Sequence, residues 1–65
     1  MSGHIIEDVE VIHETQDAIL VKSENLDEDT WIPQSQVQAE SEVWKNGQKG
    51  DLVVSEWFAR KKGWD

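Results

Sequence analysis

Few side chains in this sequence belong to the types that carry out enzyme chemistry. The chain has no cysteine and no tyrosine, and its histidines are His4 and His13. It also lacks a Gly-rich phosphate loop and a nucleophile elbow. A turn, a loop, a strand or a helix cap already explains four of the serines, namely Ser23, Ser35, Ser41 and Ser55. We therefore expect a protein that is not an enzyme and uses no cofactor.

The spacing of possible metal ligands is equally unfavourable. His4 and His13 are nine residues apart, which fits no common zinc motif. The run Asp27-Glu28-Asp29 lacks the glycine and the terminal glutamate of an EF-hand loop. We expect no metal site. The acidic run is interpreted as a solvated loop, His4 as disordered near the terminus, and His13 as an ordinary strand residue.

The four tryptophans are the residues whose role the sequence leaves most open, because an indole serves either as a core anchor or as a stacking surface. A chain of 65 residues without disulfides needs large core side chains. We therefore expect Trp31 and Trp57 in the core. Trp44 is out of phase with the alternation before it, and Trp64 follows the expected helix. Both are predicted to be partly exposed, as aromatic residues at interfaces are.

The charge distribution decides which partners are favoured. The net charge is −8, with −10 in residues 1–44 and +2 in residues 45–65. A domain of negative net charge is repelled by the phosphates of nucleic acid. Acidic loops beside aromatic residues instead suit basic, proline-containing protein segments. We therefore predict a protein-binding module with an accessory or inhibitory role. Its candidate partner-binding residues are Trp44, Trp57, Trp64, Asp27, Glu28 and Asp29.

Two other functions stay open at this point. A weak single-stranded nucleic-acid binder would stack bases on Trp44, Trp57 or Trp64. Its phosphate contacts would be Lys45, Lys49, Arg60, Lys61 and Lys62. A structural component that self-associates through a strand edge is the third hypothesis. Neither the partner nor the oligomeric state is specified by the sequence.

The first half of the chain reads as three strands. Residues 9–14 alternate, with Val9, Val11 and His13 on one face, and residues 18–22 form an apolar run typical of a central strand. Residues 23–29 are expected to form a solvated loop. Residues 30–32 return as a strand that ends at Pro33, followed by a 3₁₀ turn over residues 34–36.

The second half is predicted to add two strands and a helix. Residues 37–43 alternate strictly and form the clearest strand of the chain. Asn46-Gly47 is typical of a hairpin turn leading to a strand over 51–54, with a bulge at Lys49-Gly50. The helix is expected over 56–62, with Ser55 as N-cap and Gly63 after its end. At helical spacing, only one of Trp57 and Phe58 can be central in a core contact.

These elements predict a mostly β fold in one domain over residues 1–65. The expected architecture is a small five-stranded, partly open barrel, Src-homology-3-like or oligonucleotide-binding-like, with one short C-terminal helix. No apolar run has the length of a membrane span, and the first residues lack the pattern of a signal peptide. We expect a soluble protein of the cytoplasm with no membrane partner.

Two segments carry a resemblance to a known group. They are Trp31-Ile32-Pro33-Gln34-Ser35-Gln36 and the C-terminal run from Val54 to Gly63. They resemble small, uncharacterised bacteriophage and prophage proteins that pair a Trp-Ile-Pro-x-Ser-Gln turn with a Glu-Trp-x-Ala-x-Lys-Lys-Gly segment. The resemblance spans the chain from Ala18 onward and implies a phage origin, a bacterial host cell and a compact barrel, but no defined activity. Gln34 and Phe58 stand where the group often has Lys and Leu. The first of these departures removes a positive charge beside the turn.

Overall fold

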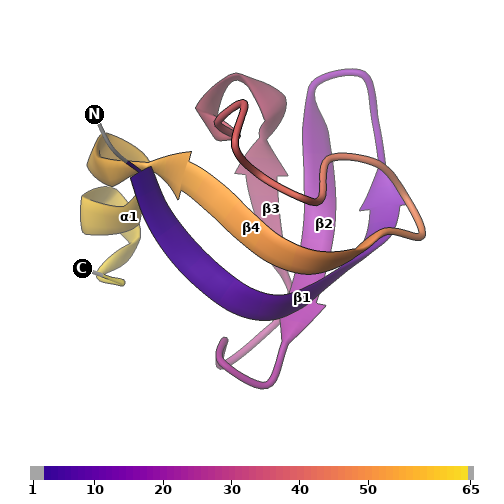
Figure 1. The fold of residues 1–65 in the computed structure, drawn as a ribbon, viewed down its shortest axis with the longest axis horizontal. Coiled ribbons are helices and arrows are strands. Elements are labelled where there is room, and N and C mark those ends of the chain that lie inside the picture. Colours follow the sequence, from indigo (N-terminus) through magenta and orange to yellow (C-terminus); the bar gives the residue numbers. More distant parts are fainter. Residues whose placement is uncertain (1–2, 65) are drawn as a thin grey trace.

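A computed structural model describes residues 3–64 of the chain. Four strands form one antiparallel sheet in the order β3-β2-β1-β4, and a short helix follows the last strand (Figure 1). The strands are β1 (Gly3–Glu14), β2 (Ala18–Ser23), β3 (Thr30–Pro33) and β4 (Lys49–Ser55). The helices are the 3₁₀ turn η1 (Gln34–Gln36) and α1 (Glu56–Lys62). The prediction of a mostly β fold with one short C-terminal helix is confirmed.

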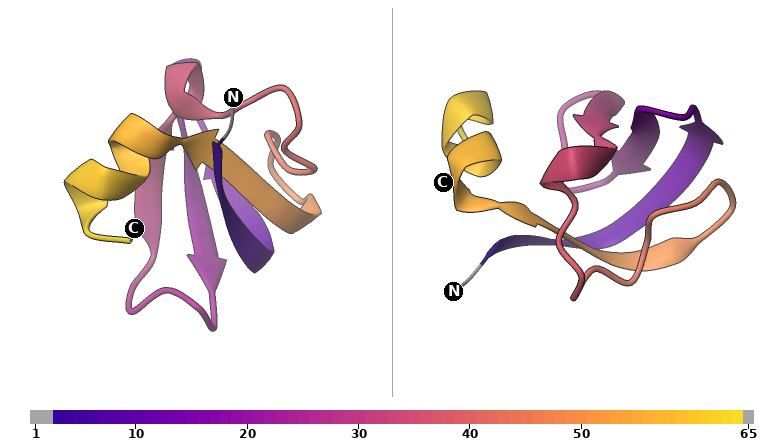
Figure 2. Two further views of the ribbon diagram at one scale, coloured as in Figure 1. Left: turned by 60° about the vertical axis from the view of Figure 1, so that its left-hand side comes forward. Right: turned by 90° about the horizontal axis from the view of Figure 1, so that it is seen from above.

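The long strand β1 joins the two halves of the sheet. It pairs with β4 over residues 3–10 and with β2 over residues 9–14, and it bends strongly between them (Figure 2). The register with β4 shifts between Ile6 and Val9, and Asp8 there has φ 57°. The bulge therefore lies in β1, and the predicted bulge at Lys49-Gly50 is wrong. A second shift after Val11 turns His13 outward, away from the face of Val9 and Val11.

The start of β1 also corrects the sequence analysis. The first strand begins at Gly3, six residues before the start at Val9 that alternation predicts. His4 is a strand residue opposite Val54 rather than part of a disordered end. The alternation of this segment is interrupted by the bulge, which explains why a strict period of two did not extend across it. Ile6 is buried on the inner face and ties this part of the strand to the core.

The segment 37–43 is the largest error of the sequence analysis. It forms no strand; Val37 alone makes an isolated bridge to Val54. Gln38 N–H donates to the carbonyl of Val53 (2.8 Å) and Glu42 N–H to that of Asp51 (2.9 Å), so the chain follows the edge of β4 irregularly. Four strands replace the predicted five. The Asn46-Gly47 pair does form a turn, with Gly47 at φ 91°, but no second strand makes it a hairpin.

The helix α1 forms as its terminal signals predict. The Ser55 hydroxyl accepts from Phe58 N–H (3.1 Å), and Gly63 ends the helix at φ 80°. With the start fixed, Phe58 and Ala59 are buried and Trp57 is 58 % exposed. The helix lies where β1 begins and β4 ends (Figure 1). The expectation that Trp57 belongs to the core is wrong.

The core is aliphatic, with Phe58 as its one aromatic member among the residues described. Its buried side chains come from all four strands, the helix and Val43: Ile6, Val9, Val11, Ile19, Val21, Ile32, Val43, Leu52, Val54, Phe58 and Ala59. Trp31 is 46 % exposed, because its neighbour Ile32 takes the inward position of β3. Its expected place in the core is therefore also wrong. No helix within residues 3–64 is long and apolar enough to cross a membrane.

Candidate binding groove

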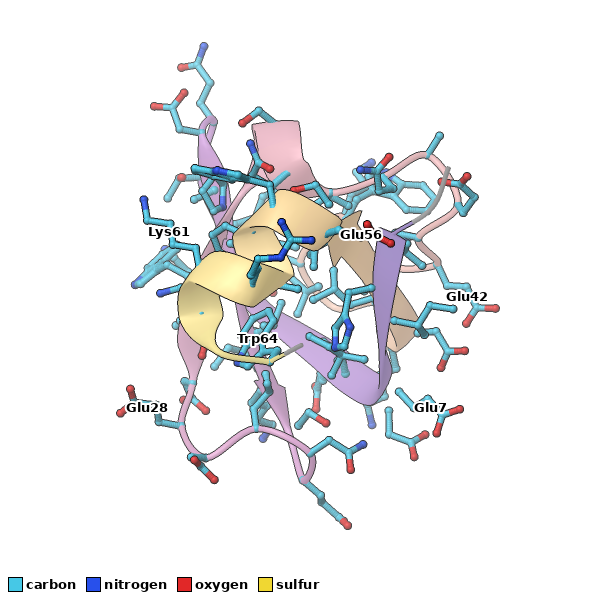
Figure 3. All side chains as sticks on the ribbon, turned by 90° about the vertical axis from the view of Figure 1, so that its left-hand side faces the viewer. Glu7, Glu28, Glu42, Glu56, Lys61 and Trp64 are labelled. Carbon is cyan, nitrogen blue, oxygen red and sulfur yellow. The ribbon has the colours of Figure 1, made fainter. Side chains whose placement is uncertain are left out.

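A hollow of about 340 Å³ opens between the loop after β2, the start of β3 and the end of α1. We call it the acidic groove. Figure 3 shows Glu28 on the loop and Trp64 below the end of the helix. The side chains around this hollow are Leu26, Asp27, Glu28, Asp29, Thr30, Trp31, Lys62 and Trp64. The structure thus brings four predicted partner-binding residues, Trp64 and the three carboxylates, to one place.

The loop that bears the carboxylates is anchored at both ends. The Ser23 hydroxyl and the Asn25 amide donate to the carbonyl of Glu7 (3.1 and 2.9 Å), at the bulge of β1. At the other end, the Thr30 hydroxyl donates to the carbonyl of Glu28 (3.0 Å). Leu26 packs against the core between these anchors. The carboxylates therefore project from a backbone that is held in position.

The carboxylates of this loop take no part in the contacts that hold the described chain together. Within residues 3–64, no hydrogen bond or ion pair engages the side chains of Asp27, Glu28 or Asp29. A second hollow of about 530 Å³ lies along the same loop and adds Asp8, Glu10 and Glu24. Lys22 in that hollow pairs with Glu10 (3.9 Å). Such a concentration of one charge raises the local concentration of cations and basic groups.

The indole of Trp64 is partly buried rather than fully exposed. It follows Gly63 and packs edge-to-face on Phe58, with ring centroids 5.8 Å apart. Its remaining surface faces the acidic groove and a neighbouring hollow of about 420 Å³ beside β1. Packing on Phe58 fixes the ring while one side stays available.

Lys62 is the basic residue of this groove among the described side chains. Its ammonium lies 5.7 Å from the centre of the Phe58 ring. Lys61, one position earlier, instead lies 5.0 Å from the centre of the exposed Trp57 ring. The two lysines thus have similar aromatic contacts but different surroundings.

The other predicted aromatic site residues lie elsewhere. Trp44 is 48 % exposed and borders a hollow of about 300 Å³ with residues of η1 and the segment after it. In Figure 1 this segment occupies the upper half of the view, whereas the loop between β2 and β3, which we call the acidic loop, is at the bottom. Trp57 lies on the solvent side of α1. The predicted binding residues therefore do not form one surface.

Trp31 is the groove residue that the sequence analysis placed in the core. The signal that identifies it is the period of two in β3, where Ile32 points inward and Trp31 must point outward. A preference for large core side chains overrode that signal. In the structure, Trp31 lies beside the acidic loop together with Trp64, whereas Trp44 and Trp57 do not.

The basic residues of the nucleic-acid hypothesis are split between the two ends of β4. Lys49 begins that strand, with Lys45 just before it, and α1 follows the other end. Seven strand residues separate the groups by about 20 Å. Arg60, Lys61 and Lys62 therefore form a patch of their own on the helix.

No cluster of three or more His, Asp or Glu side chains among the described residues is arranged to hold a metal ion. The groove offers charge, two indoles and shape rather than a metal-ligand set. No protein-family model, curated protein or solved structure matches this chain. Its function is therefore argued from the site itself.

Proposed function

We propose that this chain is a non-catalytic interaction module that binds a basic segment of a partner protein in the acidic groove. One observation carries the proposal. Three carboxylates that make no hydrogen bond or ion pair within residues 3–64 border the same hollow as the indoles of Trp31 and Trp64. The module acts as an accessory or inhibitory factor of phage or prophage origin in the bacterial cytoplasm. The two motifs of the sequence analysis support that origin.

The groove suits arginine and lysine for a physical reason. A guanidinium group stacks on an indole face while its N–H groups donate to a carboxylate. Both partners of that arrangement are present, since Trp31 is half exposed and Asp29 lines the same hollow. The loop is already anchored, so binding requires little ordering of the backbone.

A matched pair of charge variants tests this proposal. The probe is a capped peptide of three Arg-Ser-Ser repeats, titrated at low ionic strength by calorimetry. The variant Asp27→Asn, Glu28→Gln, Asp29→Asn is expected to bind it about ten-fold more weakly, as the loss of three exposed charge contacts implies. The control is Glu40→Gln, Glu42→Gln, Asp51→Asn, which changes the net charge equally. Its residues lie beside the hollow of Trp44 or on β4, outside the acidic groove.

The titrations are repeated at about 0.1 M salt, where the Debye length is about 10 Å. At that ionic strength the control is expected to change the affinity by less than about three-fold, since more distant exposed charges are largely screened. Thermal unfolding of both variants checks that the fold is kept. Equal losses in the two variants would mean that only the overall charge matters, and no binding by the parent protein would overturn the proposal.

A second candidate function has one specific observation in its favour. Trp57 is the most exposed of the described tryptophans, and Lys61 lies 5.0 Å from its ring on the same helix. Together they could stack a base and contact its phosphate. Titration with oligothymidylate at low salt, followed at the Trp57 indole N–H, tests this candidate; the net charge of −8 predicts weak binding at most.

The barrel type also belongs to the proposal. The bend of β1 and its pairing with both β2 and β4 support a partly open barrel. Its assignment as Src-homology-3-like or oligonucleotide-binding-like stays a prediction. Contacts between β3 and the residues after η1, measured by nuclear Overhauser effects, would support closure; their absence would favour an open sheet.

A further inference from the structure

The outer face of the sheet carries an aromatic and apolar patch, of which the acidic groove uses Trp31 alone. Leu20 of β2 lies opposite His13 of β1 on one side and opposite Trp31 of β3 on the other. The rings of His13 and Trp31 meet edge-to-face, with centroids 5.8 Å apart and planes at 86°. The two rings therefore converge across the middle strand, above Leu20.

The patch continues along β3. Pro33 lies two residues after Trp31 and opposite Ala18, so its ring is on the same face of the sheet. Pro33 and His13 are exposed, whereas Ala18 and Leu20 are partly buried. We call these five residues the outer-face patch: His13, Ala18, Leu20, Trp31 and Pro33.

The core does not require this patch. The inner face of the same strands supplies Val11, Ile19, Val21 and Ile32, each no more than 1 % exposed. The apolar run of β2 therefore places Leu20 on the side away from the core. Cross-strand aromatic pairs on the solvent side of a sheet contribute about 1 kcal/mol or less to stability, and aromatic residues gathered in an exposed patch mark contact surfaces.

The geometry of a sheet face restricts what can bind there. The backbone N–H and C=O groups of the sheet point along its plane, so the face offers an occupant rings and aliphatic groups but no ladder of hydrogen bonds. An extended β-segment would leave its own pairing groups unmatched. A polyproline II segment has no internal hydrogen bonds, keeps its backbone solvated, and packs proline rings on aromatic side chains.

Charge links this face to the groove already described. Trp31 belongs to both, because it also lines the acidic groove beside Asp29. At the other end of the patch, Asp17 precedes Ala18 in the turn between β1 and β2. Lys22, on the same face, is paired with Glu10. A ligand that crosses from the groove to the patch therefore meets negative charge on both sides.

We propose that the partner's binding segment combines basic residues with prolines in a polyproline II conformation. Its basic side chain enters the acidic groove, and its proline rings pack on Trp31 and the outer-face patch. This inference rests on the proposed function and adds the sequence class of the partner. Trp31 joins the two subsites.

Two probe peptides of equal length and charge separate this inference from the proposed function. One has three Arg-Pro-Pro repeats and the other three Arg-Ser-Ser repeats, both capped. The parent protein is expected to bind the proline peptide about ten-fold more tightly, because it is pre-organised and packs on the patch. Equal binding of both would overturn this inference alone, whereas binding of neither would overturn the proposed function.

Variants of two tryptophans with nearly equal exposure assign the preference to the patch. Trp31→Ala is expected to reduce the ratio of the two affinities to about two or less, while Trp44→Ala keeps it near ten. Leu20→Ser, which keeps both indoles, is expected to lower the ratio as well. An unchanged ratio in Trp31→Ala, or a larger Trp31 response to oligothymidylate than to the proline peptide, would contradict the assignment.

Discussion

The two hollows that hold exposed tryptophans differ in what their polar side chains do. Trp31 and Trp44 are 46 % and 48 % exposed, so their surface areas do not distinguish them. Around Trp44, Gln48 Oε1 accepts from the N–H groups of Trp44 and Lys45 (2.8 and 2.9 Å). Around Trp31, the carboxylates of the acidic loop hold no part of the described chain. Polar side chains that make no hydrogen bond or ion pair within the fold are available to bind a partner.

The reason lies in the backbone of the two segments. The irregular chain after η1 lacks a strand's ladder of hydrogen bonds, so side chains supply the missing partners. Ser41 accepts from Val53 N–H (3.1 Å) and donates to the carbonyl of Val43 (2.8 Å). Glu42 accepts from Asp51 N–H (2.9 Å). The acidic loop, in contrast, is held by hydrogen bonds at its ends and by the packing of Leu26 on the core, and its carboxylates stay in solvent.

The largest expected effect is on Ser41, which is buried. Ser41→Ala removes an acceptor from buried Val53 N–H and a partner from the carbonyl of Val43, so the free energy of unfolding should fall by about 2 kcal/mol. Urea denaturation measures this loss. Ser35→Ala, at the exposed position of η1, is the control and should have almost no effect. An equal midpoint for Ser41→Ala and the parent would show that the hydroxyl does not hold this segment.

Gln48 should give a smaller effect of the same kind. Gln48→Ala removes the acceptor of two exposed N–H groups and is expected to cost about 1 kcal/mol of stability. Gln48→Glu keeps a side-chain oxygen at that position and should retain most of the stability. The same urea experiment compares the two. Similar losses in both variants would contradict a role for the oxygen.

The smallest effect concerns the lysine inside the acidic groove. Lys62→Gln removes a cation that competes with the partner's basic residue, so affinity for the Arg-Ser-Ser peptide should rise about three-fold. Lys61→Gln changes the net charge equally but alters a side chain beside Trp57, and should raise affinity less. Calorimetry at low ionic strength measures both. A larger rise in Lys61→Gln would show that Lys62 does not occupy the binding position.

The sequence predicted those elements whose local signals agree with their environment. The helix over 56–62 follows from Ser55 and Gly63 at its ends, and β2 follows from its apolar run. The segment 37–43 shows the limit of alternation: Ser41 and Val43 are buried as a strand pattern implies, yet the Ser41 hydroxyl replaces strand pairing. The alternation of buried and exposed residues is the same in a paired strand and in a segment held by side-chain hydrogen bonds, so it does not distinguish them.

The candidate site was predictable in part. Asp27, Glu28 and Asp29 do meet Trp64 at one groove, although Trp64 lies far from them in the sequence. That meeting depends on where α1 ends relative to β3, which is a tertiary property. The alternation of Trp31 with Ile32 predicts an outward Trp31, whereas the need of a small domain for large core residues predicts an inward one, and the alternation holds. Aliphatic side chains and Phe58 fill the core instead.

The most direct test follows the indole N–H signals of Trp31, Trp44, Trp57 and Trp64 by two-dimensional NMR during titration with the Arg-Pro-Pro peptide. Single Trp→Phe variants assign the signals. The proposed function predicts saturable shifts at Trp31 and Trp64, with Trp44 and Trp57 nearly unchanged. Shifts confined to Trp44 or Trp57, or no shift at any indole, would contradict the acidic groove as the binding site.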